Sequence, residues 1–436
     1  MLREPKSGNM GHKAEPTLRT LLGVTLWWLP FNIFWSILLV HGLQIRIEGL
    51  VEEWVVGRAL GWLNFIGALV STLTQLVVGP ISDTLPWSAI RRRLPLIMGT
   101  LFAFFPVYLF LHTGRFDVLV LNFALLQFAI NCAAASFQAL IPDILPGSKH
   151  GIASAYMAMW ALIGNLAGMA ICIVFLGRIS VHATELALSA IIFCSWLLLF
   201  IVAILTAVLI KESAREAERK TTRFIGQILS AMNFKDVIGH RSFMWLFASR
   251  FLIQMGVYGS IPFLRWYVRD TLFSEKVVFD TAIIGICAIC GSAISIFPAG
   301  KLADKYSKRM IIFFSCSIAI FGGIIFVCAN SKVLAMIAAA ILGAGFGAFS
   351  AVDWALACNL VPREWAAKFM AVFHIAFTLP QATSSFIGGF VGDFGNQVLG
   401  KGVGWRLVFV MCVIYFAIGS WMIRNVRERQ ENQNGG

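Results

Sequence analysis

Long apolar runs separated by short polar segments dominate this chain. A helix crosses the hydrocarbon core of a bilayer with roughly 20 residues, and on that measure the pattern predicts twelve spans in an all-α integral membrane protein. The predicted spans lie near residues 20–41, 58–81, 94–112, 117–141, 150–176, 186–210, 243–268, 279–302, 308–328, 333–358, 366–392 and 403–423. A set of soluble domains is therefore excluded.

The composition agrees with this pattern. Of the 436 residues, 58% are hydrophobic and 13% are charged, whereas soluble domains carry about 25% charged residues. The net charge of +13 would suggest nucleic-acid binding in a soluble chain. Here the basic residues lie mainly in short segments between apolar runs, so membrane topology explains them and no nucleic-acid partner is expected.

Lys and Arg residues collect on one side of the predicted spans. Cytoplasmic loops carry an excess of these residues, and most of the 35 fall in the tails and the even-to-odd loops when the amino terminus is placed inside. We therefore expect a plasma (cytoplasmic) membrane protein with both termini cytoplasmic. The expected parts are a tail without a signal-peptide cleavage pattern (1–19), a six-helix bundle (20–210), a charged cytoplasmic linker (211–242), a second bundle (243–423) and a tail (424–436).

The two bundles carry matching motifs. Residues 79–83 read GPISD after the second span, and residues 300–304 read GKLAD after the eighth. Pro146 and Pro362 follow the fourth and tenth spans in the same way. This weak duplication in one orientation predicts two pseudo-symmetric six-helix bundles related about the membrane normal.

These motifs resemble those of the major facilitator superfamily, and the resemblance extends over almost the whole chain. The family signature between helices 2 and 3 is Gly, three residues, Asp and a basic cluster, which residues 79–83 and 91–93 match. The length of this loop and the run VDWALACNLVP at 352–362 are similar to the sugar:cation symporter and sucrose-transporter-like branch. Cation-coupled members of the branch carry acidic residues within helices 2 and 4. The corresponding spans here have only Asp117, at an outer edge, which argues against sodium coupling.

The resemblance implies the two-bundle fold of the superfamily and a function in transport. We expect a secondary active or facilitative transporter that moves a small organic solute, a sugar or glycoside, by rocker-switch alternating access. Two alternatives stay open: an exporter of hydrophobic drugs or lipids, and a non-transporting sensor on the same fold. The expected partners are the solute, membrane lipid and a proton as candidate coupling ion, and a monomer is expected.

The resemblance also implies a gate at the cytoplasmic helix ends. A carboxylate beside basic residues can hold a loop-helix contact in one state and release it in another, and a glycine lets two helices approach closely. The alternative interpretation is ordinary topology charges. The predicted gating residues are Gly79, Asp83, Arg91, Arg92, Arg93, Gly300, Asp304, Lys308 and Arg309.

Two formal charges lie well inside predicted spans. Arg250 lies in the seventh and Asp353 in the tenth, at similar depths from the cytoplasmic side. Because an isolated charge at that depth costs several kcal/mol, on the order of 3 by insertion scales, we predict that the two side chains pair. The pair either breaks or changes protonation during transport, or is a static structural contact.

Uncharged polar residues form stripes on several spans. On helices 2, 4, 7 and 11 the stripes follow the helical period, with Gln75 on helix 2 and Gln138 on helix 4 among their members. Helix 1 adds aromatic and amide groups. Aromatic faces beside amides suit a neutral polyhydroxy ligand, whereas interhelical hydrogen bonding is the alternative explanation of each stripe. His374 is either a proton carrier or a neutral hydrogen-bonding group. The predicted substrate-binding residues are Asn32, Trp35, Gln127, Asn131, Arg250, Gln254, Tyr258, Asp353, His374 and Gln381.

Other chemistry has little support in the sequence. There is no phosphate-binding G-x-x-x-x-G-K-[ST] loop for ATP, and Cys287 and Cys290 lack the two further ligands of a zinc site. All nine cysteines lie in apolar segments, and we expect them to be buried. With one Asp and one His well inside the spans, an enzyme is not expected, and neither a cofactor nor a metal is predicted.

Overall fold

The computed structural model describes residues 17–84, 92–145, 149–177, 181–210, 237, 239–360 and 366–427. The secondary structure of these residues is helical, without a strand, which confirms the all-α prediction. Ten helical stretches among them are long and apolar enough to cross a membrane. The seventh and eleventh predicted spans are also helical, but they fall outside these ten.

The first half of the chain contains the six predicted spans in sequence order. The first span is a composite of four helical segments, and the third is divided in two. The elements are α1 (Leu18–Thr25), α2 (Trp28–Ile37), the π-helix η1 (Leu38–Gly42), α3 (Leu43–Glu48), the 3-10 helix η2 (Glu53–Val55), α4 (Val56–Thr84), α5 (Arg93–Phe102), α6 (Phe104–His112), α7 (Phe116–Ile144), α8 (His150–Leu176) and α9 (Val181–Leu209).

The second half repeats this plan. Its first span is again a composite, and it again includes a π-helix. The elements are α12 (Arg241–Ser260), the 3-10 helix η4 (Ile261–Phe263), α13 (Leu264–Trp266), the π-helix η5 (Tyr267–Thr271), α14 (Val277–Lys305), α15 (Lys308–Cys328), α16 (Lys332–Leu360), α17 (Ala366–Leu399) and α18 (Val403–Ile423).

Two predicted boundaries are wrong because polar residues continue the helices. The first span continues past residue 41 to Glu48, and the eleventh continues past residue 392 to Leu399. In each extension the polar side chains bond to the other half of the molecule: Gln44 and Glu48 do so in the first span, and Asp393 does so in the eleventh. Their polarity marks a contact between the halves and not the edge of the membrane.

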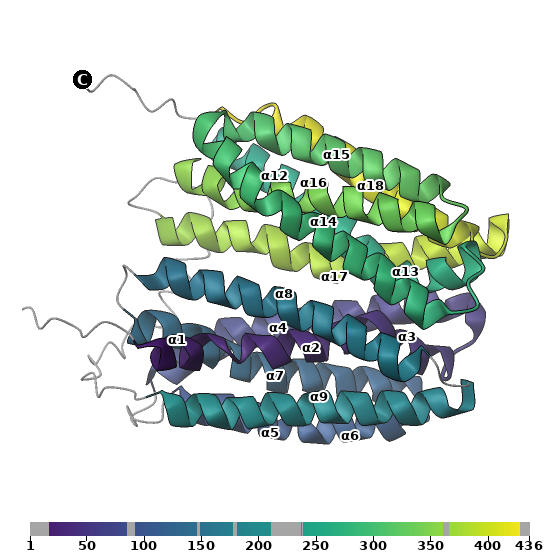
Figure 1. The fold of residues 1–436 in the computed structure, drawn as a ribbon, viewed down its shortest axis with the longest axis horizontal. Coiled ribbons are helices and arrows are strands. Elements are labelled where there is room, and N and C mark those ends of the chain that lie inside the picture. Colours follow the sequence, from purple (N-terminus) through teal and green to yellow (C-terminus); the bar gives the residue numbers. More distant parts are fainter. Residues whose placement is uncertain are drawn as a thin grey trace, which may run out of the picture.

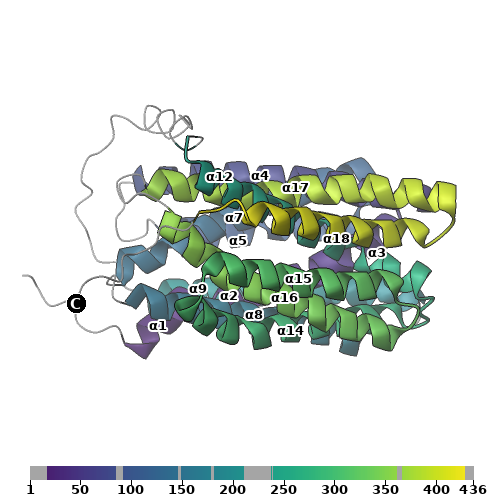
Figure 2. The ribbon, with the colours of Figure 1, turned by 90° about the horizontal axis from the view of Figure 1, so that it is seen from above.

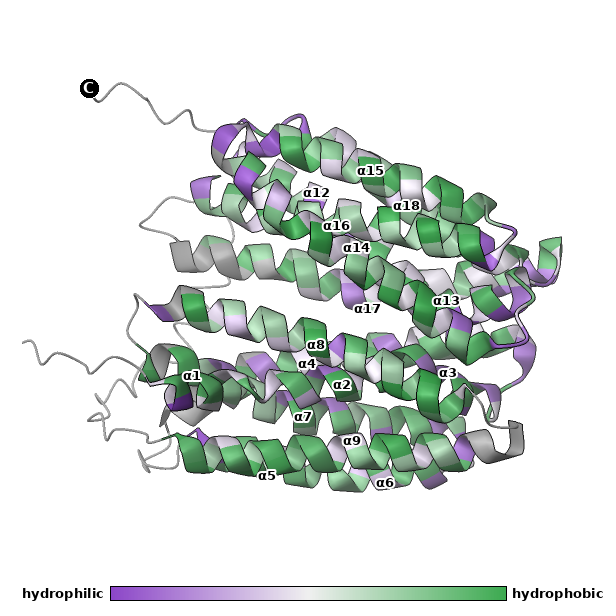
Figure 3. Cartoon of the chain, in the orientation of Figure 1, coloured by the Kyte–Doolittle hydropathy of each residue, from purple (hydrophilic) through white to green (hydrophobic). Residues whose placement is uncertain are grey.

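The two halves lie side by side (Figures 1 and 2). Helix α4 packs along α17, and α8 packs against α14, so each half supplies one helix to each pair. Hydrophobic residues cover most of the helix surfaces, and hydrophilic ones gather toward the helix ends (Figure 3). This distribution suits a protein whose flanks contact lipid.

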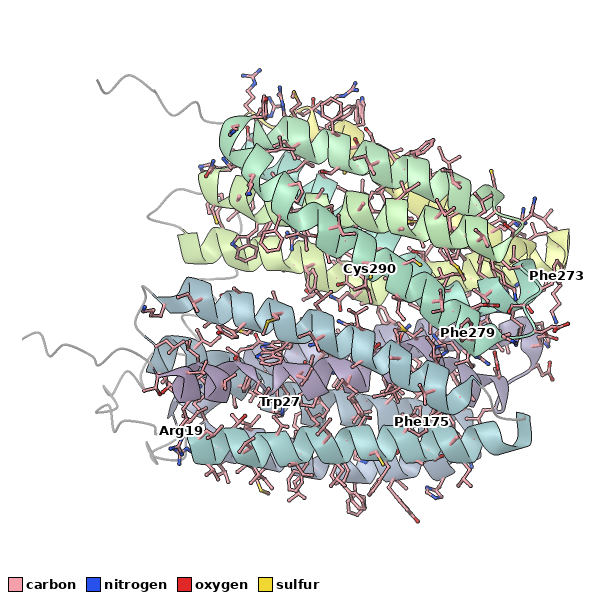
Figure 4. The ribbon with its side chains drawn as sticks, in the orientation of Figure 1. Arg19, Trp27, Phe175, Phe273, Phe279 and Cys290 are labelled. Atoms are coloured by element: carbon pink, nitrogen blue, oxygen red, sulfur yellow. The ribbon has the colours of Figure 1, made fainter. Side chains whose placement is uncertain are left out.

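We call the end of the molecule formed by residues 49–55, 272–276 and 400–402 the closed end. Phe273 lies at this end, and Arg19 lies at the opposite one (Figure 4). The connections between α3 and α4, between η5 and α14, and between α17 and α18 all belong to the closed end. The hydrogen bonds and ion pairs between the halves that are described below lie at or near it.

Candidate functional site

A cluster of three amides joins α4 to α7 in the first half. Gln75 Nε2 donates a hydrogen bond to Asn131 Oδ1 at 2.7 Å, and Asn131 Nδ2 donates to Gln127 Oε1 at 3.0 Å. Asn131 is buried, whereas Gln75 and Gln127 are half-buried. The structure therefore brings together two predicted substrate-binding residues and one residue of the predicted helix 2 stripe. Gln138, from the same helix 4 stripe, is exposed.

Asn32 and Trp35 lie half-buried on α2. The Asn32 side-chain oxygen accepts a hydrogen bond from Asn165 Nδ2 of α8 at 3.2 Å. Trp35 lies edge-on to Phe34 and Phe123, with ring centroids 5.5 and 6.4 Å away. The first half thus presents amides and an aromatic ring on neighbouring helices.

Close contact between α2 and α8 requires glycine. A Cβ atom at Gly164 would lie 2.6 Å from the backbone oxygen of Leu29, and one at Gly168 would lie 2.8 Å from Ser36 Cβ. This Gly-x-x-x-Gly spacing places both glycines on one face of α8. It fixes the distance at which Asn165 meets Asn32.

Arg250 and Asp353 form an ion pair between α12 and α16, which confirms the predicted pairing. The pair is well shielded, because the Arg250 side chain is 11% exposed and that of Asp353 is 1% exposed. The Arg250 guanidinium also lies over the Phe373 ring, 4.1 Å from its centroid. Arg250 Nε and Asp353 Oδ1 have no hydrogen-bond partner among the described residues, so each side chain keeps capacity for another contact.

The other predicted residues of the second half surround this pair in part. Gln254 is buried one turn beyond Arg250, and its Oε1 has no partner among the described residues. Tyr258 is half-buried and lies edge-on to Phe377, with ring centroids 5.7 Å apart. Gln381 is half-buried on α17, and the His374 side chain lies outside the described part of the chain.

The structure describes the predicted gate only in part. Gly79 and Asp83 belong to α4 and Asp304 to α14, but their surroundings lie outside the description, as does all of Arg91. Arg92 is buried and Lys308 half-buried. The described bonds of the two remaining arginines stay within one half. Arg93 donates to the backbone oxygen of Ile210, and Arg309 donates to those of Arg424 and Val426.

The described residues show no close helix approach at Gly300. A Cβ atom at this glycine would meet no heavy atom of the described residues within 4 Å. Gly300 lies near the end of α14 that is opposite the closed end. The close helix approach at Gly300 therefore stays a prediction.

Charged residues that the sequence analysis did not select connect the halves at the closed end. Glu48 of the first half accepts hydrogen bonds from Trp266 Nε1 at 2.6 Å and from Arg269 Nη1 at 2.9 Å, and it pairs with Arg265 at 3.5 Å. Glu53 pairs with Lys401 at 2.5 Å. Opposite charges from the two halves therefore hold this end together.

Asp393 of α17 caps the amino-terminal end of α4 in the other half. Its carboxylate oxygens accept hydrogen bonds from the backbone N–H groups of Gly57 at 2.9 Å and Arg58 at 2.8 Å. The Arg58 side chain adds an ion pair at 3.3 Å. A carboxylate is favoured at this position because helix amino-terminal ends carry unpaired N–H donors and partial positive charge.

Replacement of Asp393 by Asn is expected to weaken the closed end. The variant loses the negative charge that accepts three hydrogen bonds, and bonds to a charged group contribute about 1.5–3 kcal/mol. We expect the ratio of molecules with the closed end parted to molecules with it joined to rise roughly 12- to 140-fold. The measurement is the distance between spin labels on the exposed residues Gly114 and Val333, each changed to Cys after the nine native cysteines are replaced.

Asp117→Asn is the matched control for this prediction. Asp117 pairs with Arg115, but both belong to the first half and both are more than half exposed, at 64% and 76%. Exposed pairs contribute roughly 0–1 kcal/mol, so the label distance should stay as in the parent protein. Equal distances in the Asp393 and Asp117 variants would show that Asp393 does not hold the halves together.

The cysteines differ from expectation. Cys172, Cys316 and Cys412 are buried, but Cys194, Cys290, Cys328 and Cys358 are exposed, so the prediction that all nine are buried is wrong. The four exposed thiols lie on helices of a membrane protein, where an exposed side chain can face lipid. Among the described residues, no group of three or more His, Cys, Asp and Glu could hold a metal ion.

The comparisons with known proteins agree on the fold and differ on the cargo. The family model of the Major Facilitator Superfamily matches residues 20–385 and 246–436. The multi-drug resistance efflux pump PmrA of Streptococcus pneumoniae is 23% identical over 282 residues, which span 64% of this chain and 65% of that relative.

Two solved structures resemble the whole chain. The nucleoside transporter NupG has a TM-score of 0.72 at 14% identity, covering 94% of this chain and 99% of that one. The D-xylose-proton symporter has a TM-score of 0.71 at 16% identity, covering 94% and 98%. These likenesses show a shared fold, and the three named proteins handle different substances.

Proposed function

This chain belongs to the Major Facilitator Superfamily of membrane transporters, and from that premise we propose that it moves a small organic solute by alternating access. In this proposal the halves 20–210 and 243–423 rock about a site near mid-membrane, driven by solute or ion gradients. Both termini and the linker 211–242 are cytoplasmic, and the membrane is the plasma membrane. The closed end then faces outward, so the structure corresponds to a state closed to the exterior.

The observation that carries the proposal is that buried or half-buried polar groups lie in the middle of helices in both halves. The amide cluster of Gln75, Gln127 and Asn131 lies in the first half, and the Arg250–Asp353 pair lies in the second. A bilayer offers no hydrogen-bond partners, so such groups persist where they bond each other or face a hydrated path. The unpartnered Arg250 Nε and Asp353 Oδ1 support contact with a solute.

We propose a neutral polyhydroxy solute, a sugar or glycoside, as the cargo. Amides donate and accept hydrogen bonds with hydroxyl groups, and aromatic rings such as Trp35 pack on the C–H face of a sugar. Asn32, Gln254, Tyr258, His374 and Gln381 complete the proposed binding residues. The similarity to PmrA, which is named as a multidrug efflux pump, favours hydrophobic drugs as the second candidate cargo.

Transport assays on the purified protein in proteoliposomes test the proposal. We expect uptake of at least one labelled sugar or glycoside, with stimulation by an imposed proton gradient and none by a sodium gradient. Uptake of no sugar together with efflux of a hydrophobic dye would replace this cargo by the second candidate. Absence of any flux would favour the sensor.

Replacement of Asn131 by Ala should reduce that uptake roughly tenfold or more. The change leaves Gln75 and Gln127 without their shared partner, and an unsatisfied buried polar group costs about 1–3 kcal/mol. Gln138→Ala is the matched control, because this glutamine lies on the same helix but is exposed. Equal uptake by the two variants would remove the amide cluster from the proposed site.

The predicted gate is part of the same proposal. We assign Gly79, Asp83, Arg91, Arg92, Arg93, Gly300, Asp304, Lys308 and Arg309 to the contact that closes the cytoplasmic end in the opposite state. The lack of a close approach at Gly300 among the described residues supports this assignment, because a contact made only in the opposite state would be absent here. Each glycine would then meet its partner helix only after the closed end has opened.

A further inference from the structure

One face of the first span points toward the second half along the last part of its length. His41 lies in η1, and Gln44 and Glu48 follow at intervals of three and four residues, which places them near one face of the helix. Gln44 Nε2 donates a hydrogen bond to the backbone oxygen of Pro262 in η4 at 2.9 Å. Glu48 bonds Trp266 and pairs with Arg265. Elements η4 and α13 of the second half also pack against η1 itself.

Unpartnered polar atoms are concentrated at this junction. His41 and Gln44 are each 0% exposed, yet both ring nitrogens of His41 and Oε1 of Gln44 have no hydrogen-bond partner among the described residues. Arg265, whose side chain is 11% exposed, has two such atoms, Nε and Nη1. The junction is therefore a buried polar site between the halves, and an imidazole occupies its centre.

Three elements that pack against η1 carry charged residues. Arg265 lies on α13, Arg46 and Glu48 on α3, and Glu185 on α9. Both carboxylates are already paired, Glu48 with arginines of the second half and Glu185 with Arg46 at 3.9 Å. Helix α9 also carries the thiol of Cys194, which is exposed. No described carboxylate is left to stabilise an imidazolium, and the neighbouring guanidinium would repel it.

We propose that His41 is a proton-binding site whose occupancy opposes joining of the closed end. With the ends joined, the imidazole is buried, and no described carboxylate is free to pair with it if it takes up a proton. With the ends parted, water reaches the ring, and a hydrated histidine binds a proton below about pH 6.5. External acid therefore shifts the protein toward the state open to the exterior. This inference rests on the proposed alternating access.

The π-helix gives the site a structural basis for movement. A π-helical segment closes its backbone hydrogen bonds over five residues instead of four, and such segments are frequent at functional sites. Here η1 carries His41, and the second π-helix, η5, carries Arg269, the partner of Glu48. Both composite spans thus depart from α-helical geometry beside the junction, where parting of the ends would require them to move.

The test measures the distance between labels at Gly114 and Val333 in proteoliposomes while the external pH falls from about 8 to about 5. If one proton is linked to the change, the ratio of molecules with the closed end parted to molecules with it joined should rise by up to about tenfold for each pH unit below the pKa of a hydrated histidine. His41→Gln, which cannot bind a proton, should hold the ratio constant, and His41→Met serves the same purpose if the first variant does not fold. His112→Gln, a change at an exposed histidine near the closed end, should keep the parent response.

The outcomes separate this inference from the proposed function. A parent response that persists in the His41 variants would overturn the inference. Gly57→Leu places a side chain against Asp393 of the other half and should part the ends at any pH. A parent distance that does not change with pH while this variant still parts the ends would also overturn the inference. If neither acid nor Gly57→Leu changes the distance, alternating access itself fails.

Discussion

Replacing Arg250 by Met together with Asp353 by Leu is expected to leave the protein folded and to reduce transport by at least about 100-fold. Replacement of a buried ion pair by apolar residues of similar size is often neutral or stabilising. The double variant should therefore keep the stability of the parent protein. It should lose any step of transport that needs a charge at this position. Thermal unfolding in detergent measures the first property, and solute uptake measures the second.

The single variants provide the contrast. Asp353→Ala leaves Arg250 buried without its partner, and breaking a buried pair in this way costs about 3–5 kcal/mol. This variant should lose both stability and transport. A double variant that transports like the parent would show that the pair is a static contact. Recovery of transport by exchanging the two residues, Arg250→Asp with Asp353→Arg, would show that pairing itself is what matters.

Replacing Gly57 by Leu should trap the protein with its closed end parted and reduce transport to background. A Cβ atom at Gly57 would lie 2.6 Å from Asp393 Oδ1 and 2.8 Å from the backbone oxygen of Gly389. These atoms belong to the opposite half, so the added side chain can be accommodated if the halves separate. The label pair at Gly114 and Val333 should report a longer distance at every pH.

Gly164→Leu is the matched control, because it adds the same side chain at a contact within one half. Its Cβ atom would lie 2.6 Å from the backbone oxygen of Leu29 in α2. Rocking of the halves does not relieve that overlap, so this variant should lose stability instead of being trapped. A stable Gly57 variant with parent distance and parent transport would contradict the arrangement of α4 and α17.

The residues that the sequence identified are those whose character conflicts with lipid. Arg250 and Asp353 stand out as charges inside apolar runs, and at similar depth they could hardly persist without pairing. Gln127 and Asn131 stand out as amides at helical spacing on one span. The local sequence pattern is sufficient to identify these residues, because the free-energy cost of an unpaired polar group in a bilayer depends little on the rest of the fold.

The contacts at the closed end could not be predicted from the sequence pattern alone, because they depend on how distant helices are arranged in the fold. Asp393 and Gly57 are separated by 336 positions in the chain, and a carboxylate near a helix end resembles any other surface charge. Glu48 was missed because the predicted first span ended at residue 41. One signal was available: Gly57 and Gly61 on α4, and Ser385 and Gly389 on α17, have the small-x-x-x-small spacing of closely packed membrane helices. The sequence does not reveal that these two motifs pack against each other.

The separation between the amides proposed to bind the solute and the bonds at the closed end has an evolutionary consequence. The bonds described between Glu48 or Asp393 and the opposite half do not involve Gln127 or Asn131. If the proposed mechanism holds, substitutions at the closed end adjust how long the protein stays open to each compartment, and substitutions in the amide cluster change the solute that it carries. Relatives that descend from one ancestor would then be able to change their substrate while keeping the same preferred conformation. They would equally be able to change their conformational equilibrium while keeping the same substrate.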